Sequence, residues 1–517
     1  MVVGLSSAFL ASCWAPASGQ EIPPMGPTTR LATALGQAGD SDVPIGTVRQ
    51  PTVAEPGWVV GVTLGELYTD NLTLAASGKP AQTSWITQIQ PFLKSAYSSP
   101  RFSGVLDYKL NGYVYAGQSS YNQLTQNLNA QGTFTVVPQH VFIDGTALYG
   151  SEVINNQLPY ASGTFFLSNN RANAARYTLS PYWIQDLGNV GSMQLRYSYG
   201  RVMYNTRGIS RAQGLPGQNA NVLSGIPDVT SNALQFTLVS PKYKTWGWNV
   251  GYSDQRLVPD FGRGLEYALA KLGAYLEISN NTRLLADVGR ESNFLADGTI
   301  DKFGASFWDA GFAWSNGRDN LKVLVGHRFY GRSYEFSWSR TAALLTTSIS
   351  YHEQPTDINQ QLLGQNPGEV ISAPVGTPGL GSLRNRQVYL MKRGTASAGY
   401  EMPKGRLRVT LYDEQRTYFF SNNRQEKVAN ANIDWLFNIG ALTTLTPTLG
   451  WQRYQFQDGQ IRYNRYAQLA LVHQLNPKNF ASLRLRHDSS NFNSVLPELG
   501  SQGYGVNVIF LQWTHLF

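Results

Sequence analysis

Long apolar runs are missing from this chain of 517 residues, although Tyr, Trp and Phe are plentiful. No window approaches the ~18 to 20 apolar residues that a membrane-spanning helix needs, and the mean hydropathy is −0.26. Charged residues make up only 14% of the chain, against roughly 25% in soluble globular proteins. Low charge, many aromatic residues and no long apolar run are together typical of transmembrane strands with one apolar and one polar face.

Cysteine is also nearly absent, because Cys13 is the only one. It lies in a segment expected to be removed, so we expect neither a disulfide nor a cysteine-based metal site. The 6 histidines form no HExxH or other close ligand pair, which excludes the usual zinc motifs. We therefore predict no metal, no cofactor and no catalytic residue, and hence no enzyme. The Gly-rich stretch 376–381 lacks a strand–turn–helix context, so we interpret it as a loop.

Positive charge is in excess, at a formal +8. A nucleic-acid-binding chain gathers its Lys and Arg residues in a stripe or tail. Here they are spread singly along the chain, so we predict no nucleic-acid partner.

The N-terminus has the composition of an export signal. Residues 2–15 are apolar and small and are followed by Pro16 to Gly19, which predicts a signal peptide over residues 1–20. The basic region that normally opens such a signal is missing, so we expect the coding start to lie upstream of Met1. Residues 10–13 (LASC) also resemble a lipobox with Cys13 as the acylated residue; both routes export the protein. Residues 21–56 are rich in proline and predict a disordered periplasmic lead-in.

From residue 57 to 517 the sequence shows the two-residue period of strands. In 104–111, 406–412 and 481–486 apolar residues alternate with polar or charged ones, so each strand has one apolar and one polar face. A soluble sandwich has the same alternation, but a series of about twenty strands without helices is typical of a membrane barrel. The chain is therefore predicted to be all-β, a single antiparallel transmembrane β-barrel.

Loop lengths give the strand count and the orientation. Short turns near 98–101 and 137–139 alternate with longer connections such as 69–81 and 153–170, as expected for periplasmic turns and extracellular loops. Splitting 333–352 at Thr341–Ala343 keeps this alternation to the end. The result is about 22 strands, within a range of about 20 to 24, with both termini periplasmic and the barrel in the cell outer membrane.

The last segment, 505–517, carries Ile509, Leu511, Trp513 and Phe517 on one face. A terminal aromatic residue that closes an alternating strand is the assembly signal of outer-membrane barrels, so Trp513 and Phe517 are its predicted residues. The expected partners are outer-membrane lipid, lipopolysaccharide and the barrel assembly machinery.

Short aromatic motifs carry a resemblance to a known family. They are Glu66 to Asn71, Gly326 to Gly331 and Ser348 to Tyr351. With these motifs, residues 57–517 resemble the outer-membrane β-barrel proteins associated with PEP-CTERM/exosortase systems, close to the β-barrel porins of exopolysaccharide operons. The resemblance implies a role near exopolysaccharide export and its machinery, and it brings no catalytic residue.

Two groups of residues are candidates for contact with a ligand. Cations opposite apolar residues must face the lumen, because a charge in the bilayer centre costs ~2 to 4 kcal/mol, and they favour anions there. These predicted lumen cations are Lys109, Lys322, Arg406, Arg408, Arg484 and Arg486. A hairpin tip offers aromatic and cationic groups to an acidic polysaccharide or to lipopolysaccharide. This predicted extracellular hairpin contact comprises His327, Arg328, Phe329, Tyr330 and Arg332. Asp70 and Asn71 are interpreted as a turn, with a bound cation as the alternative.

The predicted function is a passive channel or accessory for exopolysaccharide export. A barrel of about 22 strands needs a plug or leaves a channel, and the loop 353–385 is expected to fold inward and narrow it. The alternatives are a general diffusion porin for small solutes and a non-conducting scaffold for surface assembly.

Overall fold

The computed structural model describes residues 57–154, 161, 163–167, 170–205, 226–241, 245–295, 303–363, 387–419, 424–493 and 503–517. The predicted signal peptide (1–20) and lead-in (21–56) lie outside these residues, as do Cys13 and the Gly-rich stretch 376–381.

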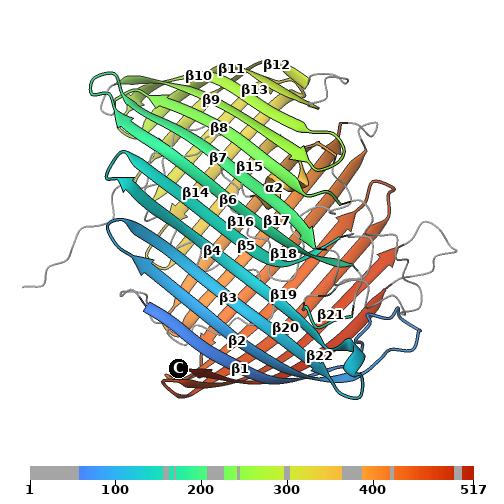
Figure 1. The fold of residues 1–517 in the computed structure, drawn as a ribbon. Coiled ribbons are helices and arrows are strands. Elements are labelled where there is room, and N and C mark those ends of the chain that lie inside the picture. The colour runs from blue at the N-terminus through green and yellow to red at the C-terminus, as the bar shows by residue number, and fades with distance from the viewer. Residues whose placement is uncertain are drawn as a thin grey trace, which may run out of the picture.

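The described chain forms one closed, antiparallel sheet of 22 strands, in which each strand pairs with the next and β1 pairs with β22 (Figure 1). This confirms the predicted barrel, its strand count and the split at Thr341–Ala343. The elements are β1 (Gly57–Thr69), β2 (Ser84–Ser98), β3 (Phe102–Tyr115), η1 (Ser119–Tyr121), β4 (Gln123–Val137), β5 (Val141–Val153), β6 (Arg171–Asp186), β7 (Ser192–Asn205), β8 (Val229–Val239), β9 (Trp246–Pro259), β10 (Leu265–Ser279), β11 (Thr282–Leu295), β12 (Phe303–Ser315), β13 (Asp319–Arg328), β14 (Gly331–Thr341), β15 (Leu345–Thr356), α2 (Ile358–Leu362), β16 (Tyr389–Met402), β17 (Gly405–Tyr418), β18 (Gln425–Asn438), β19 (Thr443–Gln455), β20 (Ile461–Asn476), β21 (Asn479–Asn493) and β22 (Tyr504–Leu516).

The wall has an apolar outer face and a buried inner face. In β1, Leu64 is 43% exposed on the outer face, whereas Thr63 and Leu67 on the inner face are nearly inaccessible. The ring of Trp85 contacts that of Tyr68 on the outer face at the far end of β1, and Trp58 is exposed near its beginning. An apolar belt with aromatic residues at both rims is the surface that a bilayer requires. The chain is therefore an outer-membrane β-barrel.

No helix among the described residues is long and apolar enough to cross a membrane.

Both ends of the sheet lie at the same rim, because β1 begins where β22 ends. The hairpin turns at this rim are tight, which marks it as the periplasmic one. In the turn between β12 and β13, the side chain of Asn316 accepts hydrogen bonds from the backbone N–H groups of Arg318 and Asp319. Gly317 adopts a φ of 85° there, a conformation that glycine adopts without steric cost.

The ladder between β14 and β15 is short, and this places the candidate site. It runs from Phe336 opposite Tyr351 down to Thr341 opposite Thr346. Above it, residues 352–356 of β15 pair with β16 alone. The extracellular end of β15 thus makes no ladder with β14, and it leads directly into α2.

Candidate functional site: the lumen and its constriction

A short segment after β15 lies inside the barrel. We call residues 356–363 the inner segment; it contains α2, and every residue in it is buried. Asp357 begins the helix, because its carboxylate accepts hydrogen bonds from the backbone N–H groups of Asn359 at 2.7 Å and Gln360 at 3.3 Å. A five-residue helix is too short to be stable by itself, so contacts with the wall must hold it.

Those contacts come from strands β7, β9 and β10. Ile358 and Leu362 pack in one apolar cluster with Val202 of β7, Leu257 of β9 and Tyr267 of β10. Four strands separate β10 from β15 along the wall. The inner segment therefore crosses part of the lumen, from β15 to the wall formed by β7 to β10. Of the loop 353–385 expected to narrow the channel, residues 353–356 continue β15 in the wall and residues 357–363 fold inward. Residues 364–385 lie outside the described residues.

Polar side chains fasten the inner segment at three points. The Tyr267 hydroxyl group donates to the Asp357 carboxylate at 2.9 Å. Gln360 donates its amide to the side-chain oxygen of Gln255 at 2.8 Å, and Tyr204 donates to the Asn359 side chain at 3.3 Å. Complete burial raises the pKa of the Asp357 carboxyl group, and hydrogen bonds from Tyr267 and from the backbone of Asn359 and Gln360 oppose the rise.

A second connection, between β5 and β6, also enters the lumen. Phe165 and Phe166 pack among Leu67, Tyr113 and Phe510, which belong to β1, β3 and β22. The sequence predicted only a long extracellular connection here. The adjacent phenylalanines in a segment otherwise read as a loop were the available signal, because exposed loops rarely carry two large apolar residues in succession.

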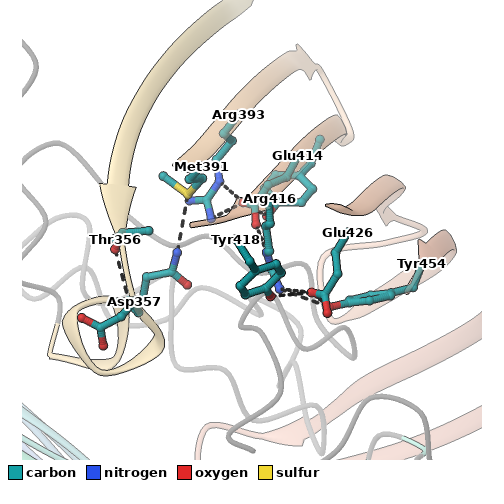
Figure 2. Close-up of polar contacts among 11 residues, drawn as sticks. Thr356, Asp357, Met391, Arg393, Glu414, Arg416, Tyr418, Glu426 and Tyr454 are labelled. Carbon is teal, nitrogen blue, oxygen red and sulfur yellow. Dashed lines mark hydrogen bonds and ion pairs between the residues drawn. The ribbon is translucent and has the colours of Figure 1, made fainter. Parts of the chain in front are cut away.

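A chain of buried ion pairs lines the inner face of β16 to β18 (Figure 2). Glu414 accepts from Arg393 at 2.6 Å and also pairs with Arg416. Arg416 reaches Glu426 at 3.8 Å, and Tyr418 and Tyr454 donate to the Glu426 carboxylate at 2.7 Å each. Two arginines thus face two glutamates, and the group carries no net charge.

The predicted hairpin contact is divided between the two faces of the wall. Arg328 faces inward, where its guanidinium group lies 3.3 Å from Glu291 and 3.1 Å from Asp309. His327 and Arg332 are exposed on the opposite face. Phe329 stands 5.6 Å from the ring of Phe419, and its ring also contacts Tyr330. The five residues therefore form no single external surface.

Arg484 and Arg486, two of the predicted lumen cations, are buried on β21. They alternate with the exposed Leu483 and Leu485, so they lie on the lumen face. The Arg484 guanidinium group lies over the ring of Phe510 at 4.5 Å, and Arg486 pairs with Asp488 at 2.7 Å.

The other four predicted lumen cations also lie opposite apolar residues. On β13, Lys322 pairs with Glu335, and on β3, Lys109 alternates with the half-buried Tyr108 and Leu110. Arg406 and Arg408 are exposed near the beginning of β17, and Arg406 lies 3.9 Å from Glu401. Several of these cations thus have acidic partners, which sequence patterns alone do not assign.

The remaining candidates have simple surroundings. Trp513 and Phe517 are 39% and 71% exposed at the lipid-facing end of β22. The Asn71 side chain accepts from the backbone of Ala75 at 2.8 Å, and Asp70 accepts from the Asn507 amide at 2.6 Å, as in an ordered turn. Within the described residues, no group of three or more His, Cys, Asp or Glu side chains is placed to hold a metal ion.

The sequence matches no protein-family model and no curated protein. Among solved structures, the chain is similar to the FrpB iron transporter from Neisseria meningitidis, at 11% identity and a TM-score of 0.47, over 89% of this chain and 82% of that chain. It is also similar to the siderophore receptor PirA from Acinetobacter baumannii, at 8% identity and a TM-score of 0.45, over 89% of this chain and 80% of that chain. At this level of likeness, nothing follows about a ligand of this chain.

Proposed function

We propose that this outer-membrane barrel is a passive channel, or an accessory to one, for exopolysaccharide export, narrowed on its extracellular side by the inner segment. The observation that carries the proposal is the inner segment itself, which is fastened across the lumen by side-chain hydrogen bonds. A segment held by a few polar contacts and a small apolar cluster restricts passage, and it can be displaced at modest cost in free energy.

The lining of the lumen supports a polar, ring-shaped ligand. Arginines lie over aromatic rings at several places on the inner wall, as Arg486 does over Tyr466 at 5.1 Å and Arg462 over Phe492 at 4.9 Å. Binding sites commonly combine aromatic surface with a few placed polar groups that fix the orientation of the ligand. Sugar rings offer an apolar face and a rim of hydroxyl groups, which suits such a lining.

The association with a PEP-CTERM-type system rests on the aromatic motifs at Glu66 to Asn71, Gly326 to Gly331 and Ser348 to Tyr351. Under this proposal the partners are lipopolysaccharide outside, the barrel assembly machinery during insertion, and the exopolysaccharide or its export machinery during transport.

Single-channel recording of the refolded protein in a planar bilayer tests the proposal. A steady conductance that the host's secreted polysaccharide blocks from one side is the expected result. Conductance that is indifferent to the polymer would indicate a general diffusion porin instead. A folded barrel without any conductance would contradict both channel functions and leave a surface-assembly scaffold.

A further inference from the structure

A small part of the inner wall, beneath the inner segment, has the composition of a binding site. β15 and β16 pair so that Gln354 lies opposite Met391 and Thr356 lies opposite Tyr389. From the inner segment, Gln361 donates its side-chain amide to the sulfur of Met391 at 3.5 Å. Gln354, Gln361, Tyr389 and Met391 therefore share one area, which we call the Met391 patch.

Three polar atoms of the Met391 patch are buried without a hydrogen-bond partner among the described residues. They are Nε2 of Gln354, Oε1 of Gln361 and the hydroxyl oxygen of Tyr389, and their residues are 6%, 2% and 1% exposed. Buried polar atoms in native proteins almost always have partners, so each exception needs an explanation. Gln361 leaves the wall with the inner segment, so the two unpaired atoms of the wall itself, on Gln354 and Tyr389, are the groups that serve a ligand rather than the closed structure.

The chemistry of the two wall atoms defines that ligand. The amide nitrogen of Gln354 donates, and the phenol hydroxyl group of Tyr389 both donates and accepts. The ring of Tyr389 lies 5.2 Å from that of Tyr418, and the Arg416 guanidinium group lies 5.5 Å from its centroid. Mixed donors and acceptors beside two neighbouring aromatic rings match the hydroxyl groups and the apolar face of a sugar.

The charge beside the Met391 patch favours a neutral sugar. Arg393 and Arg416 are both engaged by Glu414, and Arg416 also approaches Glu426. A carboxylate on the ligand would meet those glutamates as well as the arginines, and like charges repel at short range. A neutral, hydroxyl-rich saccharide avoids this conflict.

We propose that the Met391 patch is a binding subsite for a neutral saccharide, which becomes accessible when the inner segment moves off the wall. Its physiological meaning rests on the proposed channel function, but the binding itself is measurable without conduction. While the inner segment lies on the wall, the Gln361 side chain occupies the position that a sugar takes once the segment has moved away.

Isothermal titration calorimetry on the folded full-length chain in detergent tests the subsite, with maltohexaose as the neutral probe and a galacturonate hexamer as the anionic one. The wild-type protein is expected to bind maltohexaose more tightly. Tyr389→Phe and Gln354→Met should each weaken maltohexaose binding about tenfold, the effect of roughly one hydrogen bond. Neither variant should lower the midpoint of thermal unfolding, because the atoms removed have no partner in the closed structure.

Thr444→Val is the matched control. It also removes a buried hydroxyl group without a partner, but at the periplasmic beginning of β19, and should leave maltohexaose binding unchanged. Unchanged binding in both patch variants, no binding by the wild-type chain, or tighter binding of the anionic hexamer would overturn the subsite. Maltohexaose binding by a barrel that does not conduct would support the subsite and contradict the proposed channel. Conduction without maltohexaose binding would do the opposite.

Discussion

The hydrogen bond between Tyr267 and Asp357 is the sharpest point at which to test whether the inner segment narrows the lumen. Tyr267→Phe removes one hydroxyl group and keeps the ring that packs with Ile358 and Leu362. A hydrogen bond contributes ~0.5 to 1.5 kcal/mol between neutral groups and ~1.5 to 3 kcal/mol when one group is charged, and each ~1.4 kcal/mol changes an equilibrium tenfold. The ratio of inner segments off the wall to inner segments on the wall should therefore rise by roughly 2- to 150-fold, with the larger values when Asp357 is ionised.

The assay is single-channel recording at fixed pH and salt, in which the variant should spend longer in its larger conductance state. Tyr334→Phe is the control, because it removes a hydroxyl group from an exposed tyrosine of β14 and should record like the wild-type protein. Identical recordings from Tyr267→Phe and wild type, with both barrels folded, would refute the idea that the inner segment sets the conductance.

Three further predictions concern the same lumen. Burial raises the pKa of Asp357 when the inner segment lies on the wall, so the segment takes up a proton as it binds there. Protonation therefore stabilises the segment on the wall. This stabilisation is complete below about pH 3.9, the ordinary pKa of Asp, and is lost as the pH rises through the raised pKa. Conductance should accordingly increase as the pH rises from that value, and Asp357→Asn should flatten the curve. Leu362→Ala should weaken the binding of the inner segment to the wall by about 2 to 5 kcal/mol and raise conductance. The urea midpoint for unfolding of the barrel should stay unchanged. Glu414→Gln should destabilise the barrel by about 3 to 5 kcal/mol in urea unfolding, because Arg393 and Arg416 lose their shared carboxylate.

The wall of the barrel was predictable because the bilayer imposes a rule on every residue of a strand. Alternation of apolar and polar residues in 406–412 and 481–486 located the faces, and the alternation of short turns with long loops located the break at Thr341–Ala343. Both inferences use only the local sequence and the lengths of its segments. They hold wherever one face meets lipid, whatever the partner strand is.

The interior was predictable only in outline, since it depends on which strands meet. Arg393 and Glu414 are cross-strand neighbours on β16 and β17, a relation that follows from the register of the hairpin and not from either residue. The contact of Asp357 with Tyr267 joins segments that are 90 residues apart. The width of the barrel suggests that the loop 353–385 folds inward, but nothing local indicates that β10 contacts it.

Charge along the lumen is arranged in two zones, and this arrangement bears on what passes. Arg406 and Arg408 are exposed near the periplasmic beginning of β17, whereas the arginines nearer the inner segment are engaged by Glu414 and Glu426. Exposed cations at an entrance raise the local concentration of anions, but the group formed by Arg393, Arg416, Glu414 and Glu426 has no net charge and does not select for them. Under the proposed channel function, width and hydrogen bonding would therefore govern passage through the narrow part, for which the Met391 patch provides the groups.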